Sequence, residues 1–89
     1  MLRITLKSQT PEEVVLEIAG WLAGEDVELM DQELSRWHRE DGLLLLDLGG
    51  VKFVDESGLA LLKRWSGRQV VLQGGSAFVR MLLKSYGLV

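Results

Sequence analysis

The side chains that could carry out chemistry concentrate at one junction, within the sequence KFVDESGLALL at residues 52–62. Two carboxylates and a hydroxyl stand there between an apolar run typical of a strand and an apolar run typical of a helix. Asp55 or Ser57 could cap a helix N-terminus, because the first backbone amides of a helix have no partner within it. The negative charge of Glu56 would interact favourably with the positive end of the helix dipole, and Gly58 would permit close packing.

Nucleophilic catalysis is a second chemistry that the residue types allow. A triad would combine Ser57 with His38, and its carboxylate would come from Asp55 or Asp47. His38 stands at the polar end of a predicted helix, where a solvated histidine is usual. The other paired carboxylates of the chain are consecutive residues, and consecutive side chains on a helix or strand seldom converge on one substrate atom. We therefore expect no enzymatic activity.

Cofactor sites are not predicted. The chain has one His and no Cys, which excludes disulfides and the usual zinc ligand sets. The diglycines at 49–50 and 74–75 lack the Lys and the Ser or Thr of a phosphate-binding loop, and we interpret both as turns.

Composition indicates one small globular domain over residues 1–89, with 47% hydrophobic residues and a formal net charge of −3. The basic residues are dispersed, so nucleic acid is not an expected partner. The N-terminal MLRITLKS alternates apolar and polar residues and does not form a signal-peptide core, and no apolar run approaches the ~18 residues of a membrane span. These features predict a cytoplasmic protein without a membrane span.

The first half of the chain predicts a hairpin followed by a helix. Apolar and polar residues alternate over 2–7, and the β-branched run VVLEIAG at 14–20 predicts the second strand. Over 25–40 the apolar residues are spaced by three, four and three positions, as on one face of a helix. Acidic residues crowd the first turns of this helix and basic residues the last.

The second half predicts two further strand and helix pairs. The apolar run at 43–48 suits a strand covered on both faces, as in a parallel sheet. A helix over 57–65 and a strand over 68–72 follow, and Ser76 can cap a last helix that Gly87 ends. The order ββαβαβα predicts an α/β fold with a small four-stranded mixed sheet and three helices.

The stretch LLLLDLGGVKFVDESGLALL resembles the signature of the STAS domain, which sulfate transporters and bacterial anti-sigma-factor antagonists share. That signature has an apolar strand ending in Asp-Leu, a short turn, a Val-x-Phe-like pair, and Asp-Ser-(Ser/Thr/Ala)-Gly-Leu. The matching residues are Asp47, Leu48, Val51, Phe53, Asp55, Glu56, Ser57, Gly58 and Leu59. The C-terminal VVLQGGSAFVRMLLKSYGL looks like the last strand, turn and helix of the family, so the resemblance covers nearly the whole chain.

The resemblance implies an interaction switch. In anti-sigma-factor antagonists, a partner kinase that is also the anti-sigma factor phosphorylates the Ser or Thr before the Gly, and the unphosphorylated antagonist binds that partner. Ser57 would be the phosphoacceptor here. Asp55 would shape the loop, and Gly58 with Leu59 would carry the partner contact.

Two departures from the family pattern lie next to this switch. Glu56 replaces a common Ser and adds a negative charge beside the proposed acceptor. The following helix is about seven residues shorter, nearly two turns, which keeps its buried face in phase. Leu61 and Trp65 could share a face with Ala60 and form an apolar patch that adds to the partner contact. Alternatively, a short helix in a small domain buries both.

A second reading is a STAS subunit that docks constitutively on a transporter ATPase of the lipid-transport type. The motif would then be a docking surface and Ser57 would not be modified. A third class, an enzyme or a small-ligand carrier, would need a pocket that the sequence does not reveal. The first two readings predict a protein partner, either an anti-sigma factor that is a serine kinase or a transporter ATPase.

Overall fold

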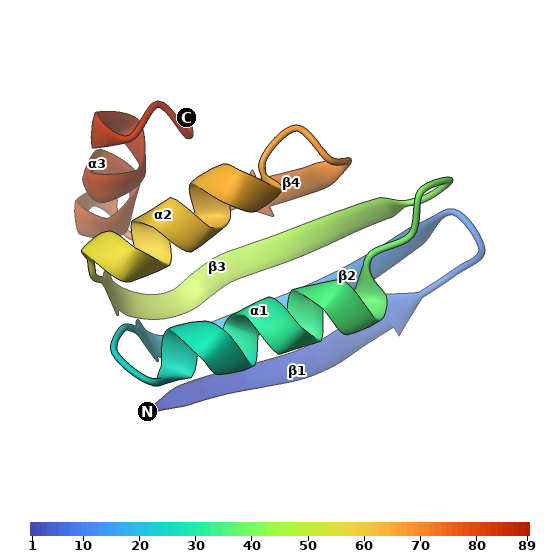
Figure 1. Ribbon diagram of the computed structural model, residues 1–89, viewed down its shortest axis with the longest axis horizontal. Coiled ribbons are helices and arrows are strands. Elements are labelled where there is room, and N and C mark those ends of the chain that lie inside the picture. The colour runs from blue at the N-terminus through green and yellow to red at the C-terminus, as the bar shows by residue number, and fades with distance from the viewer.

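The computed structural model describes residues 1–89 and shows a single sheet covered by helices (Figure 1). The elements are β1 (Leu2–Gln9), β2 (Glu13–Leu22), α1 (Asp26–Trp37), β3 (Leu43–Val54), α2 (Glu56–Trp65), β4 (Val70–Gln73) and α3 (Ala77–Ser85). The strand order is β1-β2-β3-β4, with β1 antiparallel to β2 and the other pairs parallel. The predicted order ββαβαβα and the four-stranded mixed sheet are confirmed.

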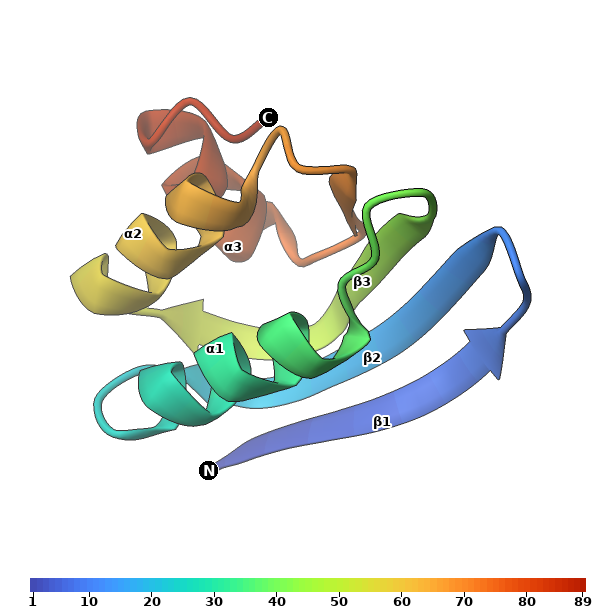
Figure 2. The same cartoon turned by 45° about the vertical axis from the view of Figure 1, so that its right-hand side comes forward.

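Helices α1 and α2 lie on the same face of the sheet (Figures 1 and 2). On that face, alternate residues of β3 are buried completely, with Leu44 and Leu46 at most 1% exposed, whereas Leu45 between them is half-buried. The prediction that both faces of this strand are covered is therefore wrong. Leu45 is apolar because it lies between Val15 of β2 and Val71 of β4, with which it forms an apolar row on the open face.

The diglycine at 49–50 is not a turn but part of β3, which continues to Val54. The register between β2 and β3 shifts between Glu17 and Ala19 of β2, so β3 has an extra residue and bulges opposite this point. A Cβ atom on Gly50 would lie 2.9 Å from the Cβ atom of Ala19, a separation that only glycine permits. The glycines thus allow a long strand to bend and to deliver the next turn to the end of the sheet.

Helix α1 ends at Trp37, before the predicted end at residue 40. His38 adopts an extended conformation, and its ring lies 5.3 Å from the ring of Trp65. This contact with the end of α2 draws the chain out of the helix.

Helix α3 has the predicted caps. The Ser76 hydroxyl accepts a hydrogen bond from the Val79 amide. At the other end Gly87 has φ +72°, and the Leu88 amide donates to the Leu83 carbonyl, as in a Schellman motif.

Candidate functional site

Asp55 is the N-cap of α2 and uses both oxygens of its carboxylate. Oδ1 accepts hydrogen bonds from the Gly58 amide and from the Ser57 hydroxyl, both at 2.8 Å. Oδ2 accepts from the amide of Gly24, 3.0 Å away in the turn between β2 and α1. Burial acts to raise the pKa of Asp55, but the hydrogen bonds from Gly24, Gly58 and Ser57 outweigh it and hold the pKa below its ordinary value. One carboxylate therefore fixes both turns at this end of the sheet.

Ser57 and Glu56 are both exposed in the first turn of α2. The Ser57 hydroxyl donates to Asp55. The first backbone amides of a helix carry partial positive charge, so an anionic group on Ser57 would lie beside them. The carboxylates of Asp55 and Glu56, which both precede Ser57 in this turn, oppose such a group electrostatically.

Gly58 and Leu59 face the core. A Cβ atom on Gly58 would lie 2.5 Å from the carbonyl oxygen of Leu22, so this glycine lets α2 begin directly against the end of β2. Leu59 is 5% exposed. Both residues position the turn, and neither presents a side chain for the partner contact that was predicted for them.

Leu61 and Trp65 do not form the exposed patch that was one of the two predicted readings. Leu61 is 0% exposed and Trp65 is 8% exposed, whereas Ala60 lies on the solvent side of α2. The short helix buries its apolar residues against the rest of the domain, and its exposed face carries small and charged residues such as Ala60 and Lys63. The indole Nε1 of Trp65 donates to Asp31 of α1 at 2.9 Å, so this side chain joins two helices.

The residues proposed for a catalytic triad are not brought together. His38 packs on Trp65, the last residue of α2, and its Nε2 donates to the Arg68 carbonyl at 2.8 Å. Ser57 is at the other end of the helix, a rise of about 12 Å away. The predicted solvated His38 is also wrong, since the ring is half-buried in this contact.

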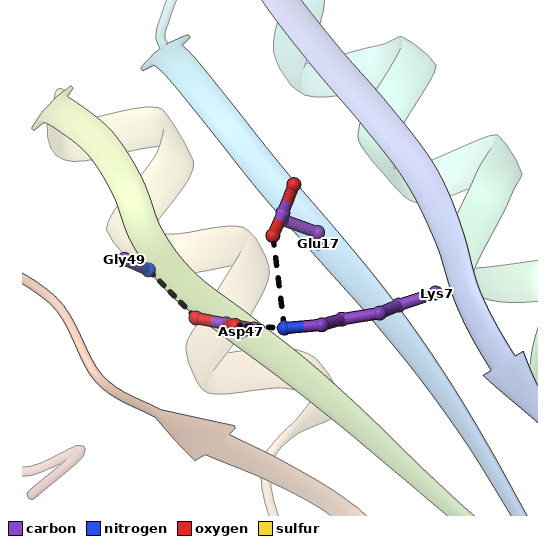
Figure 3. Close-up of polar contacts among 4 residues, drawn as sticks. All are labelled: Lys7, Glu17, Asp47 and Gly49. Carbon is purple, nitrogen blue, oxygen red and sulfur yellow. Dashed lines mark hydrogen bonds and ion pairs between the residues drawn. The ribbon is translucent and has the colours of Figure 1, made fainter.

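Asp47 lies on the open face of the sheet, alternating with the buried residues of β3 (Figure 3). Its Oδ2 lies 3.4 Å from Nζ of Lys7, and Lys7 also lies 3.8 Å from Glu17. Its Oδ1 accepts from the Gly49 amide at 2.9 Å. Lys7 of β1 thus pairs with both Glu17 of β2 and Asp47 of β3. Asp47 also stabilises the bulge through the Gly49 amide, and its partners do not include Ser57 or His38.

An exposed aromatic row next to this turn was missed by the sequence analysis. The rings of Trp21 and Phe53 are 5.8 Å apart, and those of Phe53 and Phe78 are 6.3 Å apart and stacked. Trp21 is 54% exposed and Phe78 is 52% exposed. The row joins the ends of β2 and β3 to the start of α3. Sequence spacing gives no signal for it, because the three residues belong to three separate elements.

Comparisons with known proteins agree with this architecture. A family profile described as "Mlab, STAS domain" matches residues 5–89. The structure of the anti-sigma factor antagonist SpoIIAA in its unphosphorylated form superposes with a TM-score of 0.79 and 22% identity, covering 97% of this chain and 82% of that chain. An anti-sigma factor antagonist from Mycobacterium paratuberculosis superposes with a TM-score of 0.71 and 16% identity, covering 96% and 79%. No curated protein sequence matches. None of the helices is long and apolar enough to cross a membrane.

Proposed function

This chain belongs to the STAS domain family, and from that premise we propose that it is a regulatory protein-binding module without catalysis of its own. The partner contact is centred on the first turn of α2, and Ser57 is the phosphoacceptor. The single observation that carries this proposal is the geometry of Ser57, which is exposed at a helix N-terminus and held by the capping carboxylate of Asp55.

The proposed switch acts through charge. A phosphate on Ser57 would carry a charge near −2, and the first amides of α2 could bind it. The same group would add bulk and charge at the centre of the contact. Phosphorylation would therefore abolish partner binding while the domain stays folded.

The proposed partner is a serine kinase that is also an anti-sigma factor, and the proposed location is the cytoplasm. This assignment is supported by the family membership and by the fold shared with two anti-sigma factor antagonists. The aromatic row extends the exposed surface beside the switch, and aromatic side chains are common among residues that dominate protein interfaces.

Glu56 favours a second candidate function, constitutive docking on a transporter ATPase of the lipid-transport type. Glu56 is exposed and immediately precedes Ser57, so its carboxylate opposes a further negative charge in this turn. In this alternative the turn is a permanent docking surface and Ser57 is not modified. Replacing Glu56 by Ser separates the two functions, because only a substrate of a kinase should then be phosphorylated faster.

Calorimetric titration with the cognate partner tests the proposal. Ser57→Asp should weaken the affinity at least tenfold, about 1.4 kcal/mol, with little change in melting temperature. Ser57→Ala is the matched control and should bind like the wild type. Equal affinities of the Ser57→Asp and wild-type proteins would remove the phosphorylation switch and favour constitutive docking.

A further inference from the structure

The turn at residues 23–25, between β2 and α1, is joined to the first turn of α2 by one side chain. The amide of Gly24 donates to Oδ2 of Asp55 at 3.0 Å. Gly24 is exposed, has φ +61°, and has no other part of the protein within 4 Å of the position that a Cβ atom would occupy. No packing contact on that side of Gly24 would replace the bond to Asp55 if it were lost.

The strand that precedes this turn has a separate anchor. The backbone amide of Asp55 donates to the carbonyl of Leu22, the last residue of β2, at 3.1 Å. This bond uses no side chain, so it does not depend on where the Asp55 carboxylate lies. Only the turn beyond Leu22 depends on the carboxylate.

The same carboxylate occupies the amides that a phosphate on Ser57 would bind. Oδ1 accepts from the Gly58 amide at 2.8 Å, and the backbone amides of Ser57 and Gly58 both stabilise the ionised form of Asp55. The Ser57 hydroxyl, also 2.8 Å from Oδ1, is the donor that draws the two side chains together. A phosphate of charge about −2 has no such donor, repels the carboxylate and binds backbone amides at a helix N-terminus.

We propose that phosphorylation of Ser57 releases the turn at residues 23–25 by displacing the Asp55 carboxylate from the first turn of α2. Because Oδ1 and Oδ2 belong to one planar group, a carboxylate that leaves Gly58 also leaves Gly24. The phosphate replaces Asp55 as acceptor for the amides of α2, and the backbone bond to Leu22 remains, so the change is confined to the turn.

This inference rests on the proposed function and concerns the regulation of the same site. In the phosphoryl transfer, Oγ of Ser57 bonds to the terminal phosphorus of a nucleoside triphosphate, the nucleoside diphosphate leaves, and the hydroxyl proton passes to a base of the partner kinase. The released turn borders the proposed partner contact, because Asp55 joins the two in the unmodified protein. Phosphorylation would thus change the shape of the contact as well as its charge.

Two substitutions separate the parts of this coupling. Asp55→Asn keeps one oxygen, which can accept from the Gly58 amide because Asn is also a favoured N-cap. Its amide nitrogen donates only and cannot accept from Gly24. Asp55→Asn should therefore release the turn without any charge on Ser57. Ser57→Ala removes the hydroxyl donor but leaves both amide bonds of Asp55, so the turn should stay in place.

Amide hydrogen exchange, measured by NMR, tests the release. The phosphorylated chain is made by incorporating phosphoserine at position 57 during synthesis. The Gly24 amide should exchange at least about tenfold faster in this protein and in Asp55→Asn, because it loses a bond to a charged acceptor. It should exchange at the wild-type rate in Ser57→Ala. The amide of Ile18, which is buried in β2, is the internal control and should not change in any of the proteins.

The rate at Gly24 has a clear interpretation, because added negative charge repels hydroxide and by itself would slow exchange. An unchanged Gly24 rate in the phosphorylated protein would overturn the proposal, as would an equal acceleration in Ser57→Ala. The calorimetric comparison of Ser57→Asp with the wild type tests the proposed function separately. Equal affinities together with a released turn would reject the switch and keep the coupling, whereas weakened affinity with an unchanged Gly24 amide would reject the coupling alone.

Discussion

The Oγ atom of Ser57 lies 2.8 Å from Oδ1 of Asp55, and the hydroxyl donates its hydrogen bond to the carboxylate that caps the same helix. The hydroxyl is thereby held in one orientation in the free protein. A phosphate on Oγ would remove this donor and place oxygen acceptors beside the carboxylate. Asp55 thus positions the unmodified serine and opposes its modified form.

Removing the cap should destabilise the domain. Asp55→Ala should lower the free energy of unfolding by about 1–2 kcal/mol, the cost of losing an N-cap, because the Gly58 and Gly24 amides lose their acceptor. Urea denaturation measures the change. Glu56→Ala is the control, since Glu56 lies in the same turn and is exposed. Equal effects of the two substitutions would contradict the assigned role of Asp55.

The cap should also be pH dependent. The pKa of Asp55 is lower in the folded protein than its ordinary value. The ionised carboxylate therefore makes its full contribution to the free energy of unfolding above the unfolded pKa of about 3.9. It is lost as the pH falls through the folded pKa. The difference in unfolding free energy between the wild type and Asp55→Asn should be constant above about pH 5 and shrink below about pH 4. A difference in unfolding free energy that grows as the pH falls would contradict a lowered pKa of Asp55 in the folded protein.

Gly58→Ala tests the contact between α2 and β2. Alanine favours a helix over glycine by about 1 kcal/mol, but its Cβ atom would lie 2.5 Å from the Leu22 carbonyl oxygen. The clash involves backbone and should dominate, with a net loss of about 1–3 kcal/mol in thermal or chemical unfolding. Ser57→Ala, one residue earlier on the exposed side, should change stability far less. A stabilised Gly58→Ala protein would contradict the close packing.

The single covered face of β3 predicts unequal effects for two neighbouring leucines. Leu44→Asp would bury an unpaired carboxylate and should unfold the domain. Leu45→Asp lies on the open face and should cost about 1–2 kcal/mol while the fold remains. Circular dichroism melts of both variants distinguish them. Complete unfolding of both would indicate that the second face is also covered.

His38→Ala should lower stability by about 1 kcal/mol, the usual value of one hydrogen bond. The variant loses the bond to the Arg68 carbonyl and the packing on Trp65. Partner affinity should be unchanged, because these contacts lie at the opposite end of α2 from Ser57. A loss of affinity without a loss of stability would place His38 in the binding surface instead.

Local patterns in the sequence predicted the element order and the caps of α2 and α3. These features depend on residues close together in the chain, such as Ser76 and Val79 or Asp55 and Gly58. The STAS signature likewise located the turn at 55–58, because its residues are consecutive.

Several side-chain environments that depend on contacts between elements were not decided by the sequence. Leu45 is apolar because it lies between apolar residues of two other strands. The continuous apolar run of β3 therefore suggested a second covered face that the structure does not have. For Leu61 and Trp65 helical spacing left an exposed patch and burial as alternatives, and the structure confirms burial. His38 leaves the helix because of a ring on α2 that is distant in sequence.

The bond from the Gly24 amide to Asp55 closes a loop of 31 residues. Closing this loop costs conformational entropy before the bond itself contributes any stability. We expect the bond to form late in folding, after β2 and β3 have paired. We therefore expect the cap to be absent from the folding transition state, so that Asp55→Ala speeds unfolding and leaves the folding rate nearly unchanged, as stopped-flow kinetics would measure. The carboxylate that orients the serine would then determine how long each molecule stays folded rather than how quickly it folds.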